Sequence, residues 1–205
     1  MQNITSSRSW PAAGLFVATL ALIANSYQAP AQSGASPATT AASVTATNRP
    51  IPVHILAGYD ADKAVAGTNW LAGDKFFADG QTIDRPGIAI VATTNSGPAV
   101  IYQAERYSMS KFTYAPVPNG DYTVKLHFCE TYDGITGPGE RVFGFEVKGN
   151  GPAVKDFDVY AAAGGGLKPV VKSVPITVTN QTIEVLFNSQ VENPQINAVE
   201  IFSGR

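Results

Sequence analysis

The sequence predicts an all-β fold, an antiparallel β-sandwich of jelly-roll type, on three observations. Apolar and polar residues alternate in several short runs, and 19 glycines and 14 prolines separate these runs. No run after the first 31 residues keeps a helical period over three turns. Short strands at close spacing, divided by turn residues, are typical of sandwiches and jelly rolls. With 44% hydrophobic residues, the chain can bury a core.

The first 31 residues are expected to lie outside this fold. They contain a basic residue, Arg8, an apolar run over 12–24, and the small-x-small sequence Ala29-Pro30-Ala31. This layout is typical of a secretory signal peptide. The apolar run is shorter than the ~20 residues that a spanning helix needs. We therefore expect cleavage after Ala31, export to the cell envelope, periplasm or medium, and no stable membrane anchor.

A linker is predicted over residues 32–50, "QSGASPATTAASVTATNRP". Its serine, alanine, threonine and proline residues offer little apolar surface to bury, so ordering this segment would not be offset by packing. The sequence thus predicts a disordered linker at 32–50 and one folded domain at 51–205, a length within the usual range for a single domain.

The clearest strand is predicted in "GDYTVKLHFCE", which begins at Gly120. Its inward positions are apolar, its outward ones are mostly polar, and the turn signal "PNG" precedes it. We expect the inward set to be Tyr122, Val124, Leu126 and Phe128.

Three further strand regions follow. "RVFGFEVKGNG" alternates in the same way and ends at Gly149-Asn150-Gly151, where the Asn-Gly pair favours a hairpin. "SVPITVTNQTIEVLFNS" predicts two strands around a polar turn at Asn180-Gln181, and "INAVEIF" predicts a last strand. In such a fold the loops at one end usually carry the function.

Charge and cysteine content exclude several classes of function. The net charge is −2, 15% of residues are charged, and no run is rich in lysine or arginine. A nucleic-acid partner or an anionic membrane surface would call for a clustered basic face. Cys129 is the sole cysteine, so no internal disulfide can form, and we expect it to be a half-buried strand residue.

The sequence offers few candidates for catalysis. It has no G-x-S-x-G motif, and its two histidines, His54 and His127, have no zinc-site spacing. A glycan hydrolase could use two of the loop carboxylates Glu130, Asp133 and Glu140, provided that they lie ~5 to 10 Å apart. Solvated loop acids are the commoner explanation, and hydrolysis is kept as an alternative.

Calcium is a further possibility that the sequence supports weakly. Five aspartates lie in a glycine-rich stretch, at positions 60, 62, 74, 79 and 84. Hard oxygen ligands suit Ca²⁺, but the EF-hand spacing is absent. We therefore assign no metal or cofactor.

Aromatic and polar residues at strand ends favour a binding site. Sugars present C–H patches next to hydroxyl groups, and they suit exposed aromatic faces with acids or amides nearby. The candidates in strand-end loops are Phe76, Phe77, Tyr107, Tyr132, Asp133 and Asn193. Tyr107 and Tyr132 are followed by polar loops, which favours their exposure, whereas Tyr102 and Tyr114 are expected to pack.

These motifs together resemble the malectin domain family. The resemblance runs from "HILAG" to "EIF" and rests on "YQAERY", "NGDYTVKLHFCE" and "NPQINAVEI". It implies a lectin-type β-sandwich without enzymatic activity. The animal endoplasmic-reticulum member binds glucose-containing disaccharides and N-glycan ends, and bacterial relatives occur as carbohydrate-binding modules in exported glycan-degrading proteins.

The resemblance also implies roles for single residues. Tyr107 matches the tyrosine that stacks on sugar, and Tyr132 with Asp133 matches an aromatic pair whose second member is here an acid. Glu192, next to Asn193, matches an acid that accepts hydroxyl hydrogen bonds. Phe77, or its neighbour Phe76, approximates an earlier tyrosine of the family.

The sequence therefore predicts an exported, non-catalytic carbohydrate-binding domain for an oligosaccharide or polysaccharide, with glycan-processing proteins as possible partners. A hydrolase and an envelope protein-interaction module that has lost its sugar site are the two alternatives.

Overall fold

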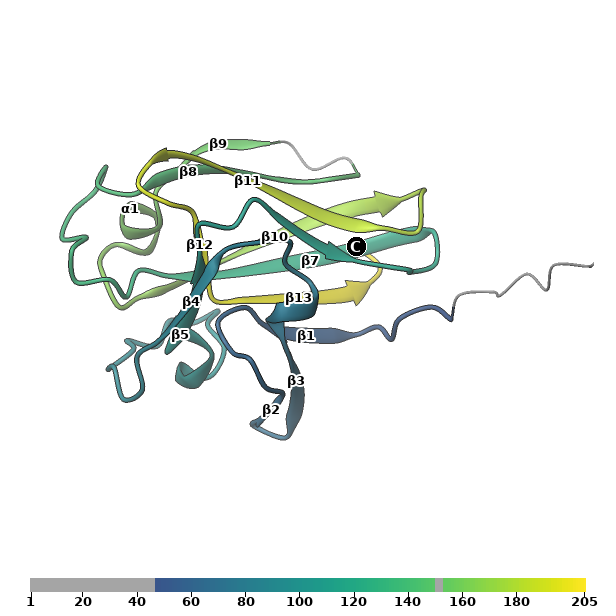
Figure 1. Cartoon of the computed structure of the whole chain (residues 1–205), viewed down its shortest axis with the longest axis horizontal. Helices are drawn as coiled ribbons and strands as arrows, with labels where there is room; N and C mark the ends of the chain where they lie inside the picture. The colour runs from purple at the N-terminus through teal and green to yellow at the C-terminus, as the bar shows by residue number, and fades with distance from the viewer. Residues whose placement is uncertain (1–46, 150–152) are drawn as a thin grey trace, which may run out of the picture. The chain divides into compact units, whose positions relative to one another are not determined.

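The computed structural model describes residues 47–149 and 153–205 (Figure 1). Most of the regular secondary structure in this part of the chain is β-strand, and the predicted all-β sandwich is confirmed. The predicted signal peptide and nearly all of the predicted linker lie outside the described residues. Within them, no helix has both the length and the apolar character needed to cross a membrane.

One layer of the sandwich is a six-stranded sheet with the order β10-β7-β13-β1-β3-β2. Neighbouring strands are antiparallel except β1 and β3, which pair in parallel. The bounds are β1 (Val53–Leu56), β2 (Lys63–Val65), β3 (Thr68–Ala72), β7 (Gly120–Cys129), β10 (Pro169–Val178) and β13 (Ala198–Ser203).

The second layer is a four-stranded antiparallel sheet with the order β6-β11-β8-β9. Figure 1 shows β8, β9 and β11 stacked across from β7, β10 and β13. The bounds of its strands are β6 (Lys111–Tyr114), β8 (Val142–Val147), β9 (Val154–Phe157) and β11 (Ile183–Val191).

A small third sheet, β12-β5-β4, joins the sandwich at the end of β7 that carries Cys129. It consists of β4 (Gln81–Asp84), β5 (Ala104–Tyr107) and β12 (Gln195–Ile196). Two 3₁₀ helices, η1 (Gly73–Lys75) and η2 (Ala99–Tyr102), and one short α-helix, α1 (Val159–Ala163), complete the described elements. The Asp158 side chain caps α1, and Gly164 ends it with φ of 71°.

The core between the layers follows the alternation of β7. The four residues predicted to point inward are at most 4% exposed. The ring of Phe128 packs on three aromatic rings of the facing sheet, at centroid distances of 4.9 to 6.0 Å; these are Phe143, Phe145 and Phe157. Burial of these large side chains supplies the main stabilisation of the sandwich.

The opposite face of β7 is also covered near its end. Cys129 is fully buried rather than half-buried, because η2 and the β2–β3 hairpin place Tyr102 and Trp70 in a second apolar cluster with it. Burial raises the pKa of the Cys129 thiol to about 12, so the thiolate is strongly disfavoured. Tyr102 and Tyr114 are both fully buried, as predicted.

The predicted turns are partly described. β8 pairs with β9 in antiparallel fashion, which confirms the hairpin, although residues 150 and 151 of its turn lie outside the described residues. The polar turn at Asn180-Gln181 connects β10 to β11, and these two strands belong to different sheets.

The domain makes contacts from Arg49 onward, two residues before the expected start at residue 51. The backbone N–H of Arg49 donates to the Pro116 carbonyl at 2.8 Å. Its guanidinium lies over the rings of Phe76 and Tyr114, at 5.3 and 5.4 Å from their centroids.

Candidate ligand-binding cleft

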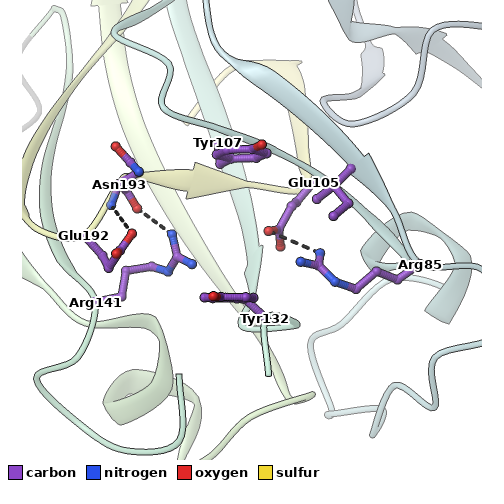
Figure 2. Close-up of a pocket in the computed structure, with 8 residues that line it drawn as sticks. Arg85, Glu105, Tyr107, Tyr132, Arg141, Glu192 and Asn193 are labelled. Atoms are coloured by element: carbon purple, nitrogen blue, oxygen red, sulfur yellow. Dashed lines mark hydrogen bonds and ion pairs between the residues drawn. The ribbon is translucent and has the colours of Figure 1, made fainter. Parts of the chain in front are cut away.

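A cleft of about 290 Å³ lies where the small sheet meets the loops of the sandwich (Figure 2). Its residues come from β4 and the residue after it, from β5, from the loop after β7, from the residue before β8, and from the β11–β12 loop. They are Ile83, Arg85, Glu105, Tyr107, Tyr132, Arg141, Glu192 and Asn193.

The small sheet forms one wall of the cleft. On its central strand, Tyr107 lies between Gln81 of β4 and Gln195 of β12, and Glu105 lies opposite Ile83. Because side chains alternate along a strand, Glu105 and Tyr107 share the face that is turned to the cleft. The Tyr107 hydroxyl donates to Gln81 Oε1 at 2.6 Å, which fixes the direction of its ring.

The other face of β5 anchors this wall. Arg106 donates from Nε to the Ala57 carbonyl at 3.1 Å and forms an ion pair with Asp74. Gly58 packs directly on this strand, since a Cβ at Gly58 would lie 2.3 Å from the Glu105 nitrogen. These contacts hold the backbone of Glu105 and Tyr107 in place.

Two tyrosine rings face each other across the cleft. Figure 2 shows Tyr107 and Tyr132 edge-on, with their flat faces turned toward the space between them. Tyr132 is 44% exposed, a large fraction for an aromatic side chain. Gly134 allows its loop to pass the ring, because a Cβ there would lie 2.5 Å from ring atoms of Tyr132.

One end of the cleft carries the ion pair of Arg85 and Glu105. Arg85 Nη1 lies 3.3 Å from Glu105 Oε1 and donates to Thr131 Oγ1 at 3.0 Å. The Thr131 hydroxyl donates in turn to Glu105 Oε2 at 2.8 Å. Glu105 is 2% exposed, and this buried charge is therefore both paired and hydrogen-bonded.

The other side is held by Arg141 and Glu130. Arg141 Nε donates to Glu130 Oε2 at 2.7 Å, and Arg141 Nη1 donates to the Asn193 carbonyl at 2.6 Å. Burial raises the pKa of the Glu130 carboxyl, and the charge of Glu105 acts in the same direction, although Arg141 and the Tyr132 N–H oppose the shift.

Glu192 and Asn193 form the rim at this side. Glu192 has φ of 57°, and its Oε2 accepts from the Asn193 N–H at 3.2 Å. Pro194 follows and favours an extended Asn193. Figure 2 shows both side chains at the cleft, on the side away from Arg85.

Four of the six residues expected in a binding site line the cleft, namely Tyr107, Tyr132, Glu192 and Asn193. Asp133 is exposed and is not among the lining residues. Phe77 is 8% exposed and packs in the core, with its ring 5.2 Å from that of Phe112. The cleft also contains Ile83, Arg85, Glu105 and Arg141, which sequence reasoning missed.

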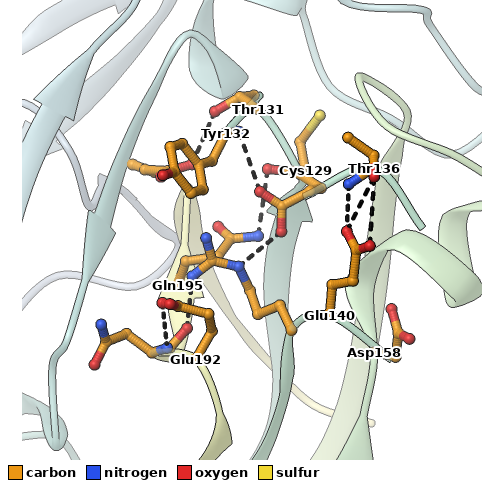
Figure 3. Close-up of polar contacts among 12 residues, drawn as sticks. Cys129, Thr131, Tyr132, Thr136, Glu140, Asp158, Glu192 and Gln195 are labelled. Carbon is orange, nitrogen blue, oxygen red and sulfur yellow. Dashed lines mark hydrogen bonds and ion pairs between the residues drawn. The ribbon is translucent and has the colours of Figure 1, made fainter. Parts of the chain in front are cut away.

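The carboxylates considered for hydrolysis have other partners. Glu130 is bound to Arg141, and Glu140 accepts from the backbone N–H groups of Thr136 and Gly137 at 2.6 and 3.1 Å. In Figure 3 the Glu140 side chain turns to Thr136. None of Glu130, Asp133 and Glu140 is among the residues that line the cleft.

The aspartates considered for calcium are also dispersed. Asp62 accepts from the Ala72 N–H at 2.7 Å, Asp74 pairs with Arg106, and Asp79 accepts from the Ser110 N–H and hydroxyl at 2.6 Å. Over residues 47–149 and 153–205, no group of three or more acidic, histidine or cysteine side chains could hold a metal ion.

The sandwich and its end cleft define a lectin-like β-sandwich domain. A malectin domain model matches residues 52–201, and the chain belongs to the malectin domain family. Receptor-like protein 4 of Arabidopsis thaliana is 29% identical over 157 residues, which span 69% of this chain and 25% of that protein. A probable receptor-like protein kinase of the same plant is 29% identical over 161 residues, or 62% and 20% of the two chains.

Solved structures show the same fold at low identity. The complex of the plant peptide RALF23 with FER and LLG2 matches with a TM-score of 0.62 at 20% identity, over 74% of this chain and 48% of that one. The ANX1 ectodomain of Arabidopsis thaliana gives 0.62 at 17%, over 74% and 47%. A Bacteroides uniformis β-glucuronidase gives 0.63 at 16%, over 76% and 18%. This chain thus corresponds to one part of each larger protein.

Proposed function

We propose that this chain is an exported, non-catalytic carbohydrate-binding domain that holds a glucose-containing oligosaccharide, or another glycan, between Tyr107 and Tyr132. The observation that carries the proposal is the pair of tyrosine rings facing each other across the cleft (Figure 2). The apolar C–H faces of a sugar ring pack well on aromatic faces, which at this site remain accessible to a ligand.

The polar groups around the rings suit the rim of a sugar. Hydroxyl groups both donate and accept, and they pair well with amides, carboxylates and guanidinium groups. Asn193 and Glu192 supply an amide and a carboxylate on one side, and Arg85, which is 21% exposed, supplies donors on the other. Few polar groups around an apolar surface are typical of small-ligand sites.

A non-catalytic role is supported by the state of the cleft carboxylates. Both oxygens of Glu105 are engaged, by Arg85 and by Thr131, so this group is poorly placed to exchange a proton with a ligand. Glu192 lies at the rim. The family membership, which rests on residues 52–201, agrees with a binding role.

Export is proposed from the signal-peptide pattern at residues 1–31 and from the relatives. Two of the similar structures are described as an ectodomain and an extracellular domain. The absence of a second cysteine means that the domain relies on its core rather than on internal disulfides in that compartment.

A glycan array tests the proposal, with wild type, Tyr107→Ala and Tyr160→Ala compared side by side. Tyr160 lies on α1 outside the cleft and is the matched control. We expect wild type and Tyr160→Ala to give equal signals on the same glycans and Tyr107→Ala to give clearly weaker signals on them. Uniform non-binding of the wild-type protein would contradict the proposal.

A protein-interaction module is the second candidate, and apolar exposure at the cleft favours it. Ile83 lines the cleft and is 38% exposed, and Val191, next to Glu192, is 46% exposed. The similar FER structure is titled as a complex with a peptide and LLG2. On this reading, Ile83→Ser would abolish capture of a protein partner, while the glycan array would stay blank for every variant.

A further inference from the structure

One buried carboxylate connects the two sides of the cleft. Glu130 follows β7, is 1% exposed, and has a different partner on each oxygen. Its Oε1 accepts from the Tyr132 N–H at 3.1 Å, and its Oε2 accepts from Arg141 Nε at 2.7 Å. Arg141 continues to the Asn193 carbonyl at 2.6 Å. The loop that bears Tyr132 and the loop that bears Asn193 are thereby joined through a single carboxylate.

We propose that Glu130 and Arg141 are a positioning pair that sets the separation of Tyr132 from Asn193, and that protonation of Glu130 loosens the cleft and releases its glycan in mild acid. This inference rests on the proposed glycan-binding function. Glu130 does not have to touch the sugar, because its carboxylate acts through the backbone N–H of Tyr132 and through Arg141.

The surroundings of Glu130 favour proton uptake above the usual range of a carboxyl. Burial raises its pKa, and so does the negative charge of Glu105 on β5, while Arg141 acts in the opposite direction. Cys129 of β7, which precedes Glu130, is neutral because burial raises the pKa of its thiol to about 12. Arg85, bonded to Thr131, adds a second cation to this group of charges. Protonation removes the negative charge that Arg141 Nε now faces and weakens this charge-assisted hydrogen bond.

As the pH falls, the affinity for glycan should decrease while the contribution of Glu130 to the free energy of unfolding should increase. Because the pKa of Glu130 is raised in the folded state, that state binds more protons than the unfolded chain between the ordinary and the raised value. The contribution of Glu130 to the free energy of unfolding therefore increases as pH falls through this window. Glycan affinity decreases over the same window, and this separates positioning from a purely structural role.

The experiment is calorimetric titration of the full chain with maltose between pH 7.5 and 4.5. We expect the wild-type affinity to fall about tenfold in mild acid, which corresponds to a loss of about 1.4 kcal/mol. Glu130→Gln should bind about tenfold more weakly at pH 7.5 and change little with pH. The control, Glu140→Gln, removes an exposed carboxylate outside the cleft and should follow wild type. A wild-type affinity that stays constant with pH, or a Glu130→Gln profile equal to that of wild type, would overturn the inference.

Amide hydrogen exchange provides a readout that needs no sugar. After correction for intrinsic rates, acidification of wild type should speed the exchange of both the Tyr132 and Asn193 amides. Glu130→Gln should show the fast rates already at pH 7.5. If this variant does not fold, Glu130→Gln/Arg141→Gln removes the unpaired charge and keeps the test. A change at Tyr132 without one at Asn193 would refute the coupling. Coupled exchange without maltose binding would support the coupling and count only against the glucose-containing ligand of the proposed function.

Discussion

Two clusters of the described residues pair carboxylates with basic side chains: Glu200 is half-buried among histidines, and Glu105 and Glu130 are buried beside arginines at the cleft. On the outer face of the six-stranded sheet, Glu200 accepts from His54 Nδ1 at 2.7 Å and His127 Nε2 at 2.8 Å. Tyr102 closes this cluster with its hydroxyl 2.8 Å from His127 Nδ1. At the cleft, Glu105 and Glu130 are bound by arginines that also line an open space.

The two clusters differ in the partners of their carboxylates, which are histidines in the Glu200 cluster and arginines at the cleft. Both oxygens of Glu200 are bonded to histidines, and Trp70 packs against the two imidazole rings; Glu200 and His127 also line a hollow of about 570 Å³. The cleft cluster holds two loops whose tyrosine and amide side chains face outward. Tyr102 and Tyr107 also differ, five residues apart, since the first is fully buried and the second lines the cleft.

The largest effect is expected from Arg141→Ala. It leaves Glu130 buried and unpaired, and breaking one side of a buried ion pair costs about 3–5 kcal/mol. Urea unfolding at pH 7 should show this loss in the free energy of unfolding. A loss below about 1 kcal/mol would mean that water replaces the guanidinium and that the pair does not hold the loops together.

Glu200→Gln should lower the free energy of unfolding by about 1–3 kcal/mol at pH 7, since it weakens two hydrogen bonds to a charged acceptor. Burial alone would raise the pKa of Glu200. His127 and His54 donate hydrogen bonds to the carboxylate and carry favourable charge, and these two effects outweigh burial, so the pKa lies below its usual 4.5. Because the pKa of Glu200 is lower in the folded state than in the unfolded chain, the carboxylate stabilises the fold at any pH above its ordinary pKa. This stabilisation is lost as the pH falls through the pKa of the folded state.

The difference between wild type and Glu200→Gln should accordingly shrink in acid, as measured by urea unfolding from pH 7 down to pH 3. Glycan affinity of this variant at pH 7 should stay within twofold of wild type. A large change in affinity would show that the two regions are coupled, contrary to the comparison.

Tyr107→Ala and Tyr132→Ala should each lower glycan affinity by about 0.5–1.5 kcal/mol, which is up to about tenfold, because each removes one stacking face. Tyr102→Phe is the matched control: it removes the hydroxyl bonded to His127 and should reduce stability without reducing affinity. Titration calorimetry with an array-selected disaccharide and urea unfolding measure the two quantities. Equal affinity losses in all three variants would point to general destabilisation.

The sequence predicted the sandwich well because β7 alternates strictly and its turn residues are local signals. It also placed Tyr107 and Tyr132 at strand ends, where polar loops favour exposure. The sequence did not reveal the contacts that build the cleft wall, because β5 pairs with β4 on one side and, on the other, with β12, which lies nearly 90 residues further along the chain. No local pattern marks Arg85 or Arg141 as members of a site.

Two site expectations differ from the observed cleft for physical reasons. Phe77 lies in a loop by sequence, yet it bridges to Phe112 and packs in the core beneath Arg106. Asp133 follows Tyr132 directly but is exposed and is not among the lining residues. Glu105 lies in the "YQAERY" motif on the same strand face as Tyr107, and this two-residue spacing was a signal that could have identified it.

Asp133→Ala should have the smallest effect, less than twofold on glycan affinity, because Asp133 is exposed and outside the lining residues. Titration against the same disaccharide checks this. A loss near tenfold would place Asp133 in contact with the sugar, as the family resemblance implies, and would extend the site beyond the cleft.

The most direct test of the central claim is an NMR titration of ¹⁵N-labelled protein with the disaccharide that gives the strongest array signal. We predict chemical-shift changes at residues 83–85, 105–107, 131–132 and 192–193, with the Tyr107 and Tyr132 rings broadened or shifted, and none at His127 or Glu200. Shifts centred on the His54–Glu200–His127 cluster, or no shifts at the cleft at saturating sugar, would contradict the account.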